Sequence, residues 1–308
     1  MMFIAPLKRV AMPSRYEVYH PHVPCALHNV LSIVLLISCR SVVADQITPT
    51  CTGESEYLKD TISAVHQSLN NVKAVQLPTA VHQVTAPMVD ATLLHGYAFE
   101  PEGASASILI APGNGMAARS VISKIPLNQV HHGIYVFDYR GHGENEGNTT
   151  SIAQLEEDTA PLWRWVAAKH PQSRTALYGM SQGGVVALSM LDKIASQDGI
   201  LVLDGTPSRI PRYGIHFLLI NHDWFSCPSS LDPVNRIQAA AQLPRLEIVR
   251  GEFDHNVTWH DASELFGEAS SRGIPTEILA GMYHPFSPRD DAAARMLRIE
   301  KIIDELDK

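Results

Sequence analysis

The feature that most restricts the possible folds is the pentapeptide Gly179-Met-Ser-Gln-Gly183. It follows an apolar stretch with the length of a buried strand and precedes a predicted helix. A serine in a strand–turn–helix of this kind is typical of a nucleophile elbow, in which two glycines permit a turn that larger side chains would obstruct. The pattern predicts that Ser181 is a nucleophile. It also places the backbone N–H of Gln182 at a helix N-terminus, where it can face a developing oxyanion.

Short apolar runs alternate with helical patterns from about Val81 to the end of the chain. We predict buried strands at 106–111, 133–137, 175–178, 200–203, 246–249 and 276–279. Strands that alternate with helices form parallel sheets covered on both faces. The predicted fold class is therefore α/β, with a mostly parallel, twisted β-sheet, helices on both faces and a short cap insertion.

Two predicted helices carry start signals. Ser151 and Gln154 have the spacing of a capping box, and apolar residues recur at helical spacing behind them. At the end of the chain we expect Ser287 to cap a helix and Pro288 to occupy its first turn.

A serine nucleophile needs a base within hydrogen-bond reach and an acid that orients the base. Asp254 follows the predicted strand 246–249, and His284 follows the next strand, 276–279. Both therefore reach the same edge of the sheet, in the order serine, acid, histidine. We predict His284 as the base and Asp254 as the acid. Asp204, which ends the strand 200–203, is an alternative acid.

This order resembles that of the α/β-hydrolase superfamily from about Val81 to the C-terminus. Besides the elbow, the matching segments are 251–257 as the acid loop, 281–284 as the histidine loop and Asp138-Tyr-Arg-Gly-His-Gly143. The last of these looks most like the serine aminopeptidase-like and monoacylglycerol lipase-like branches. The usual histidine-glycine of the oxyanion loop is replaced by Pro112-Gly113-Asn114-Gly115. A backbone N–H is what the chemistry needs, so the resemblance implies Asn114 and Gln182 as the oxyanion hole.

The segment from about 206 to 232 breaks the strand–helix alternation, and we interpret it as a cap over the functional edge of the sheet. Its aromatic residues either line an apolar substrate pocket or bury the cap against the sheet. They are Tyr213, Phe217, Trp224 and Phe225.

The N-terminal part has a basic stretch followed by an apolar run at 30–39. A run of this length suits a signal peptide and is short for a bilayer span of about 20 residues. The run can be followed by cleavage after Ala44, or by lipidation of Cys39 as in a bacterial lipoprotein. We expect a leader at 1–44, a lead-in at 45–80 and the catalytic domain at 81–308. The expected location is periplasmic or secreted, with membrane attachment through the leader or through a lipidated Cys39.

Only Cys51 and Cys227 lie beyond both predicted exits from the leader. In an oxidising compartment they can pair, and as free thiols they can be buried; the sequence leaves both open. No cysteine pair has CxxC spacing.

The other polar residues indicate no additional chemistry. A net charge of −8 makes a nucleic-acid partner unfavourable. We predict neither a cofactor nor a metal site, because the sequence has no HExxH motif. His131 and His132 precede a predicted strand and are expected to be solvated. His142 is expected to have a structural role rather than a contact with substrate.

These features together predict acyl transfer to water from a small ester or peptide. Carboxylic esters are the first choice because an apolar cap suits acyl chains. The alternatives are a serine peptidase of the aminopeptidase-like branch and a non-catalytic binding protein on the same fold.

Overall fold

The computed structural model describes residues 51–52, 76–147, 149, 151–210 and 227–308. Eight strands form one sheet in the order β1-β2-β4-β3-β5-β6-β7-β8. The strands are β1 (Val81–Pro87), β2 (Leu93–Phe99), β3 (Ala106–Ala111), β4 (Gly133–Phe137), β5 (Arg174–Met180), β6 (Ile200–Asp204), β7 (Arg245–Gly251) and β8 (Thr276–Leu279). β1 and β2 run antiparallel to their neighbours, and β4, β3, β5, β6, β7 and β8 are parallel. All six predicted strands are present, so the mostly parallel sheet is confirmed.

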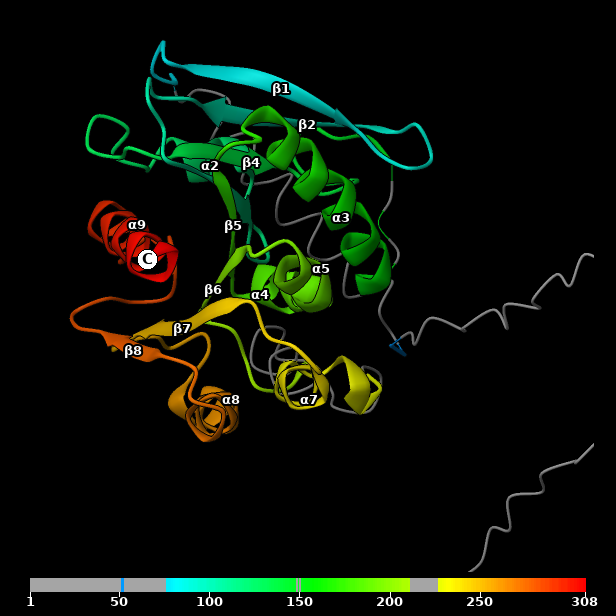
Figure 1. Ribbon diagram of the computed structural model, residues 1–308, viewed down its shortest axis with the longest axis vertical. Coiled ribbons are helices and arrows are strands. Elements are labelled where there is room, and N and C mark those ends of the chain that lie inside the picture. Colours follow the sequence, from blue (N-terminus) through cyan, green and yellow to red (C-terminus); the bar gives the residue numbers. More distant parts are fainter. Residues whose placement is uncertain (1–50, 53–75, 148, 150, 211–226) are drawn as a thin grey trace, which may run out of the picture. The chain divides into compact units, whose positions relative to one another are not determined.

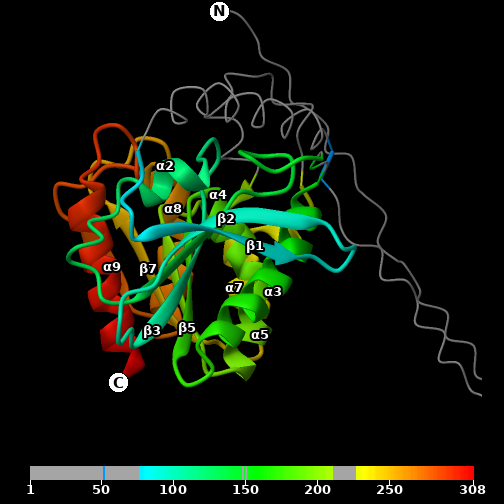
Figure 2. The ribbon, with the colours of Figure 1, turned by 90° about the horizontal axis from the view of Figure 1, so that it is seen from above.

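Helices cover both faces of the sheet, as Figures 1 and 2 show. On one face lie α2 (Ala118–Ile122) and α9 (Ala292–Asp307). On the other lie α3 (Ile152–Lys169), α4 (Gln182–Ala187), α5 (Leu191–Ser196), α7 (Pro233–Ala239) and α8 (Trp259–Ser271). The central strands β4 and β6 are buried along their whole length, because both of their faces are covered.

The start of α3 follows the predicted local signal. The Ser151 side chain accepts a hydrogen bond from Gln154 N, and Leu155, Leu162 and Val166 lie in the core. This satisfies one of the backbone donors that a helix N-terminus exposes.

The start predicted for the C-terminal helix is wrong. α9 begins at Ala292, and Asp291 caps it by accepting a hydrogen bond from Ala294 N. Ser287 instead donates its backbone N–H to His284 O. The intervening residues belong to the loop after β8, because the carboxylate of Asp290 holds that loop in place.

Cys51 and Cys227 form a disulfide, which settles the alternative that the sequence left open. The bridge lies beside a small apolar cluster that includes Tyr139, Ile152 and Val186. The leader at 1–44 with Cys39 lies outside the described residues. Within the ranges that the structure describes, no helix combines the length and apolar character that a bilayer span requires.

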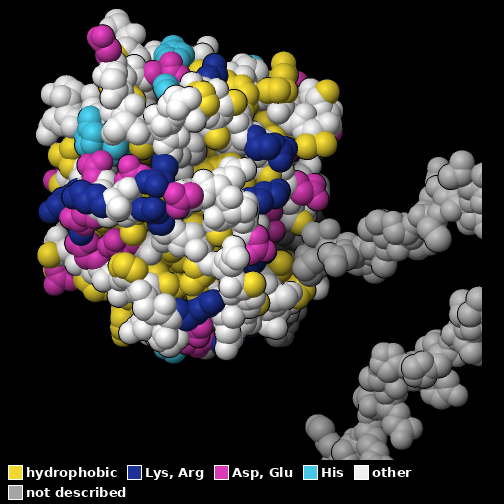
Figure 3. Space-filling view, viewed as in Figure 1, with side chains coloured by type: hydrophobic (Ala, Val, Ile, Leu, Met, Phe, Trp, Pro, Cys, Tyr) yellow, Lys and Arg dark blue, Asp and Glu magenta, His cyan; other side chains and the backbone are white. Residues whose placement is uncertain are grey.

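On the face drawn in Figure 3, basic and acidic side chains lie beside one another rather than in a patch of one sign. Ion pairs join some side chains of opposite charge, such as Arg298 of α9 with Glu277 of β8 and with Glu305 of α9.

Candidate active site

Ser181 lies at the sharp turn between β5 and α4. Its backbone has φ 54° and ψ −117°, a strained conformation for a residue with a side chain. Ser181 N donates a hydrogen bond of 2.8 Å to Asp204 O, which ties the turn to the end of the neighbouring strand β6. The predicted strand–turn–helix around the serine is therefore present, and Ser181 is buried.

Two glycines explain why this turn can form. A side chain on Gly179 would place its Cβ 2.7 Å from the Cα of Gly184, inside the following helix. A Cβ on Gly183 would lie 2.0 Å from the carbonyl oxygen of Ala111, at the end of β3. Contacts this short are forbidden for real carbon atoms, so glycine is required where the elbow packs against the neighbouring loop.

Asp254 and His284 meet at the same edge of the sheet, after β7 and β8. Nδ1 of His284 lies 3.0 Å from Oδ1 and 2.9 Å from Oδ2 of Asp254. Both side chains are buried, the imidazole at 6% exposure and the carboxylate at 0%. A carboxylate on Nδ1 fixes the tautomer that leaves Nε2 as the proton acceptor.

The acid loop is organised around the same carboxylate. Oδ1 of Asp254 also accepts hydrogen bonds from the backbone N–H groups of Asn256 and Val257, at 3.0 and 2.9 Å. The guanidinium of Arg250 donates to the carbonyl oxygens of Asp254 and Val257. These bonds fix the position of the carboxylate independently of its contact with His284.

The histidine loop is held by a second buried carboxylate. Asp290 accepts hydrogen bonds from Tyr283 N and Phe286 N, the residues on either side of His284 and Pro285. Arg295 on α9 donates to both oxygens of Asp290 and to Tyr283 O. The loop is therefore anchored to α9.

Asp204, the alternative acid, belongs to this anchor. Its two oxygens accept hydrogen bonds from Nη1 of Arg295 at 2.8 and 2.7 Å, and Oδ2 also accepts one from the Tyr178 hydroxyl. Burial opposes the charge on Arg295, but the adjacent carboxylates of Asp204 and Asp290 outweigh it and raise the pKa of the guanidinium. Of the two candidate acids, Asp254 contacts His284 and Asp204 contacts Arg295.

The predicted oxyanion residues lie at the start of α4 and in the turn after β3. Gln182 is buried in the first turn of α4, and Asn114 is partly exposed in the turn after β3. The Tyr139 hydroxyl donates a hydrogen bond of 3.0 Å to Pro112 O. It thereby orients the peptide that leads into Gly113 and Asn114.

The segment 138–143, which carried part of the family resemblance, has a structural role. Asp138 accepts hydrogen bonds from Ala118 N at 2.7 Å and Glu144 N at 3.2 Å. Burial is the largest influence on its carboxyl group and raises its pKa to about 7. Arg140 is paired with Asp158 and Asp90, and Nδ1 of His142 lies 3.0 Å from Arg140 O. The structural interpretation of His142 agrees with these contacts.

A surface pocket of about 270 Å³ adjoins His284. Phe253 and Tyr283 line it, with their ring centroids 5.6 Å apart. They immediately precede Asp254 and His284, and this adjacency was the sequence signal that could have identified them. The predicted pocket residues Tyr213, Phe217, Trp224 and Phe225 lie outside the described residues.

The expectation of two solvated histidines before β4 is wrong for His132, which is 1% exposed, and correct for His131. His132 is buried because α9 packs over the start of β4 and brings Asp304 to within 3.2 Å of its Nε2. The sequence offered no signal for this contact, because His132 and Asp304 are far apart along the chain.

A family model described as serine aminopeptidase, S33, matches residues 104–226. An uncharacterized protein of Salmonella typhi, YfhR, is 31% identical over 213 residues, which cover 62% of this chain and 70% of that protein. YfhR of Escherichia coli K12 is 29% identical over 206 residues, covering 62% and 69%.

Solved structures share the fold. An esterase of Pyrococcus furiosus superposes with a TM-score of 0.55 at 16% identity, covering 77% of this chain and 94% of that one. A mutant of the esterase E40 superposes with a TM-score of 0.52 at 18% identity, covering 82% and 98%.

Proposed function

This chain belongs to the α/β-hydrolase superfamily, and on that premise we propose that it is a serine hydrolase that cleaves carboxylic esters through an acyl-enzyme. The observation that carries the proposal is the buried pair of Asp254 and His284, at the sheet edge where the elbow holds Ser181. This edge, at the carboxyl ends of parallel strands, is where open α/β sheets bind their ligands.

In the proposed reaction, Nε2 of His284 takes the hydroxyl proton of Ser181 as Oγ attacks the ester carbonyl carbon. Asp254 stabilises the imidazolium that forms and keeps its own proton state unchanged. The imidazolium then gives the proton to the leaving alkoxide, and the alcohol departs. Water, deprotonated by the same imidazole, attacks the acyl-enzyme and releases the acid with Ser181 restored.

The negative charge of each tetrahedral intermediate falls on the former carbonyl oxygen. We assign its stabilisation to the backbone N–H groups of Gln182 and Asn114. One such donor is typically worth about 3 kcal/mol of transition-state free energy. Support comes from the packing of Gly183 against Ala111 O, which places the elbow helix beside the loop that carries Asn114.

The preference for esters rests on two aromatic side chains beside His284, in a pocket that polar residues also line. Phe253 and Tyr283 present aromatic rings in the pocket beside His284. The sequence of the predicted cap also contains aromatic residues. Rings of this kind bind an acyl chain or an apolar alcohol. A serine peptidase is the second candidate, because the matching family model is described as a serine aminopeptidase.

We also propose that the protein is exported, to the periplasm or the exterior, either free or attached through the leader or Cys39. The disulfide between Cys51 and Cys227 supports export, because such bonds persist in oxidising compartments.

The test is hydrolysis of p-nitrophenyl esters of increasing acyl length by the purified protein and by Ser181→Ala. We expect a rate that depends on chain length and is lost in the variant. A folded wild type no faster than Ser181→Ala on every ester would contradict the proposal. Cleavage of aminoacyl anilides would then favour the peptidase. No labelling of Ser181 by a fluorophosphonate would indicate a binding protein.

A further inference from the structure

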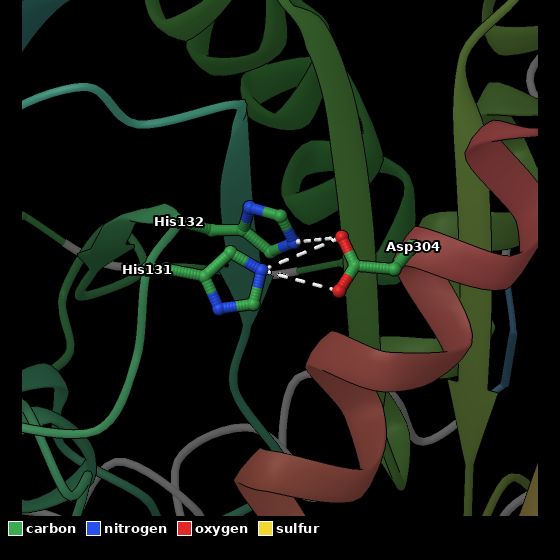
Figure 4. Close-up of side chains that lie close together, drawn as sticks. All are labelled: His131, His132 and Asp304. Carbon is green, nitrogen blue, oxygen red and sulfur yellow. Dashed lines mark hydrogen bonds and ion pairs between the residues drawn. The ribbon is translucent and has the colours of Figure 1, made fainter.

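A second cluster of polar side chains lies at the end of the sheet where the parallel strands begin, opposite the end that carries Ser181. His131 and His132 immediately precede β4, and Asp304 comes from the last turns of α9. In Figure 4 the Asp304 carboxylate points at a nitrogen of each imidazole ring. We propose that His131, His132 and Asp304 bind a divalent transition-metal ion of the zinc class.

The distances suit such an ion. Nε2 of His132 lies 3.2 Å from Oδ1 of Asp304, and Nε2 of His131 lies 3.1 Å from Oδ2. One ligand atom from each of the three residues can be chosen so that all lie within 4.8 Å of one another. In a tetrahedral site with bonds of about 2.0 Å, neighbouring ligand atoms are separated by about 3.3 Å. Small side-chain rotations therefore bring the three atoms around one ion.

Each imidazole has a partner on its other nitrogen. Nδ1 of His132 lies 3.1 Å from the Ser105 hydroxyl, and Nδ1 of His131 lies 3.5 Å from Oε2 of Glu300. Oε1 of Glu300 also accepts the backbone N–H groups of both histidines at 3.0 Å. Partners of this kind hold metal-binding histidines in the tautomer whose Nε2 carries the lone pair.

The environment of His132 gives independent support. The residue is 1% exposed, and no group among the described residues completes a hydrogen bond with its Nε2. Oδ1 of Asp304 lies 3.2 Å from this nitrogen, at an ion-pair distance. A metal ion bound to both atoms would satisfy the buried Nε2 more fully.

The charge and access of the cluster also favour a cation. The carboxyl groups of Asp304 and Glu300 both lie beside the two histidines. The side chains of His131 and Asp304 are 54% and 42% exposed, so an ion can enter from solvent and keep a bound water. Two imidazoles favour zinc-like ions over magnesium or calcium.

The ion would join the end of α9 to the start of β4 and stabilise that contact. The test is equilibrium dialysis of the chelator-treated full chain against Zn²⁺, with thermal unfolding and Co²⁺ absorption spectra beside it. The variants are Asp304→Asn and His132→Gln, and the matched control is His260→Gln, an exposed histidine of α8. Zinc bound at other histidines, including His284, should be the same in the wild type and in every variant.

We expect the wild type and His260→Gln to bind one more Zn²⁺ than Asp304→Asn and His132→Gln. Zinc should raise the Tm of the first two proteins by more than that of the other two. With Co²⁺, only the first two should give the intense absorption bands of this tetrahedral site. Equal stoichiometry and equal Tm gain in all variants would overturn the proposal. If the variant of the buried His132 or the variant of Asp304 fails to fold, the same comparison is made with His131→Gln, whose side chain is largely exposed.

Discussion

Nδ1 of His284 lies within 3.0 Å of both carboxylate oxygens of Asp254, and neither side chain has appreciable contact with solvent. Oδ1 of the same carboxylate is fixed by two backbone N–H groups of its own loop. The geometry therefore restrains the imidazole through a group that is itself restrained. A substitution that alters this carboxylate alone should therefore change kcat.

Asp254→Asn should lower kcat by about 10⁴-fold with little change in KM, because an amide favours the wrong tautomer of His284. The fold should survive, since the Asn side-chain oxygen can still accept the two backbone hydrogen bonds. Steady-state kinetics on the best ester, with circular dichroism, provide the measurement. Asp192→Asn, an exposed change on α5, is the control, and activity equal in both variants would contradict the assignment.

Most of the fold was predictable because strand and helix patterns are local. The apolar runs at 106–111 and 133–137 match β3 and β4 residue for residue, and the order of Ser181, Asp254 and His284 along the chain placed all three at one sheet edge. These features depend on periodicity and topology, which a sequence carries directly.

The residues that support the site were not predictable, because their partners are distant in sequence. Arg295 reaches Asp204 across 91 positions, and Tyr139 reaches Pro112 across 27. A buried arginine and an ordinary helix arginine look alike in a sequence. The start of α9 was misplaced for a related reason: Ser287 and Pro288 form a good local start signal, but Asp290 is recruited by the histidine loop.

Arg295→Met should lower the free energy of unfolding by about 3–5 kcal/mol, because it leaves the buried carboxylates of Asp204 and Asp290 without their cation. Arg295→Lys keeps the charge but loses the fork of donors, so its loss should be smaller. Urea unfolding measures both. A Met variant as stable as the wild type would show that the carboxylates become protonated or hydrated at little cost.

Tyr139→Phe tests the support of the oxyanion loop. Loss of the hydrogen bond to Pro112 O should cost about 1–2 kcal/mol of stability. It should also lower kcat by about tenfold, because the peptide before Asn114 loses its fixed orientation. Tyr135→Phe is the matched control, since its hydroxyl contacts Glu100 and His170 instead. An equal loss of kcat in both variants would mean that the effect is general destabilisation.

Asp138 should make stability depend on pH. Its pKa is about 7 in the folded protein, chiefly through burial, and about 3.9 in an unfolded chain. Between about pH 4 and pH 7 the folded protein therefore keeps a proton on Asp138 that the unfolded chain has lost. Its contribution is complete below pH 4 and is lost as pH rises towards 7, at up to about 1.4 kcal/mol per pH unit. Urea unfolding from pH 4.5 to 7.5 should give a wild-type stability that falls relative to Asp138→Asn, whereas parallel curves would contradict the raised pKa.

Reduction of the Cys51–Cys227 disulfide should destabilise the protein, because the bond joins residues 176 positions apart and restricts the unfolded chain. Loss of such a bond typically costs about 2–5 kcal/mol. The denaturation midpoint of the wild type should therefore fall when a reductant is added. Cys51→Ser should start at the lower midpoint and be insensitive to reductant, which separates the effect of this bond from reduction elsewhere. Mass spectrometry of the linked peptides first confirms that the bond is present before reduction. If the reductant then leaves the midpoint of the wild type unchanged, the bond does not stabilise the protein and the prediction is wrong.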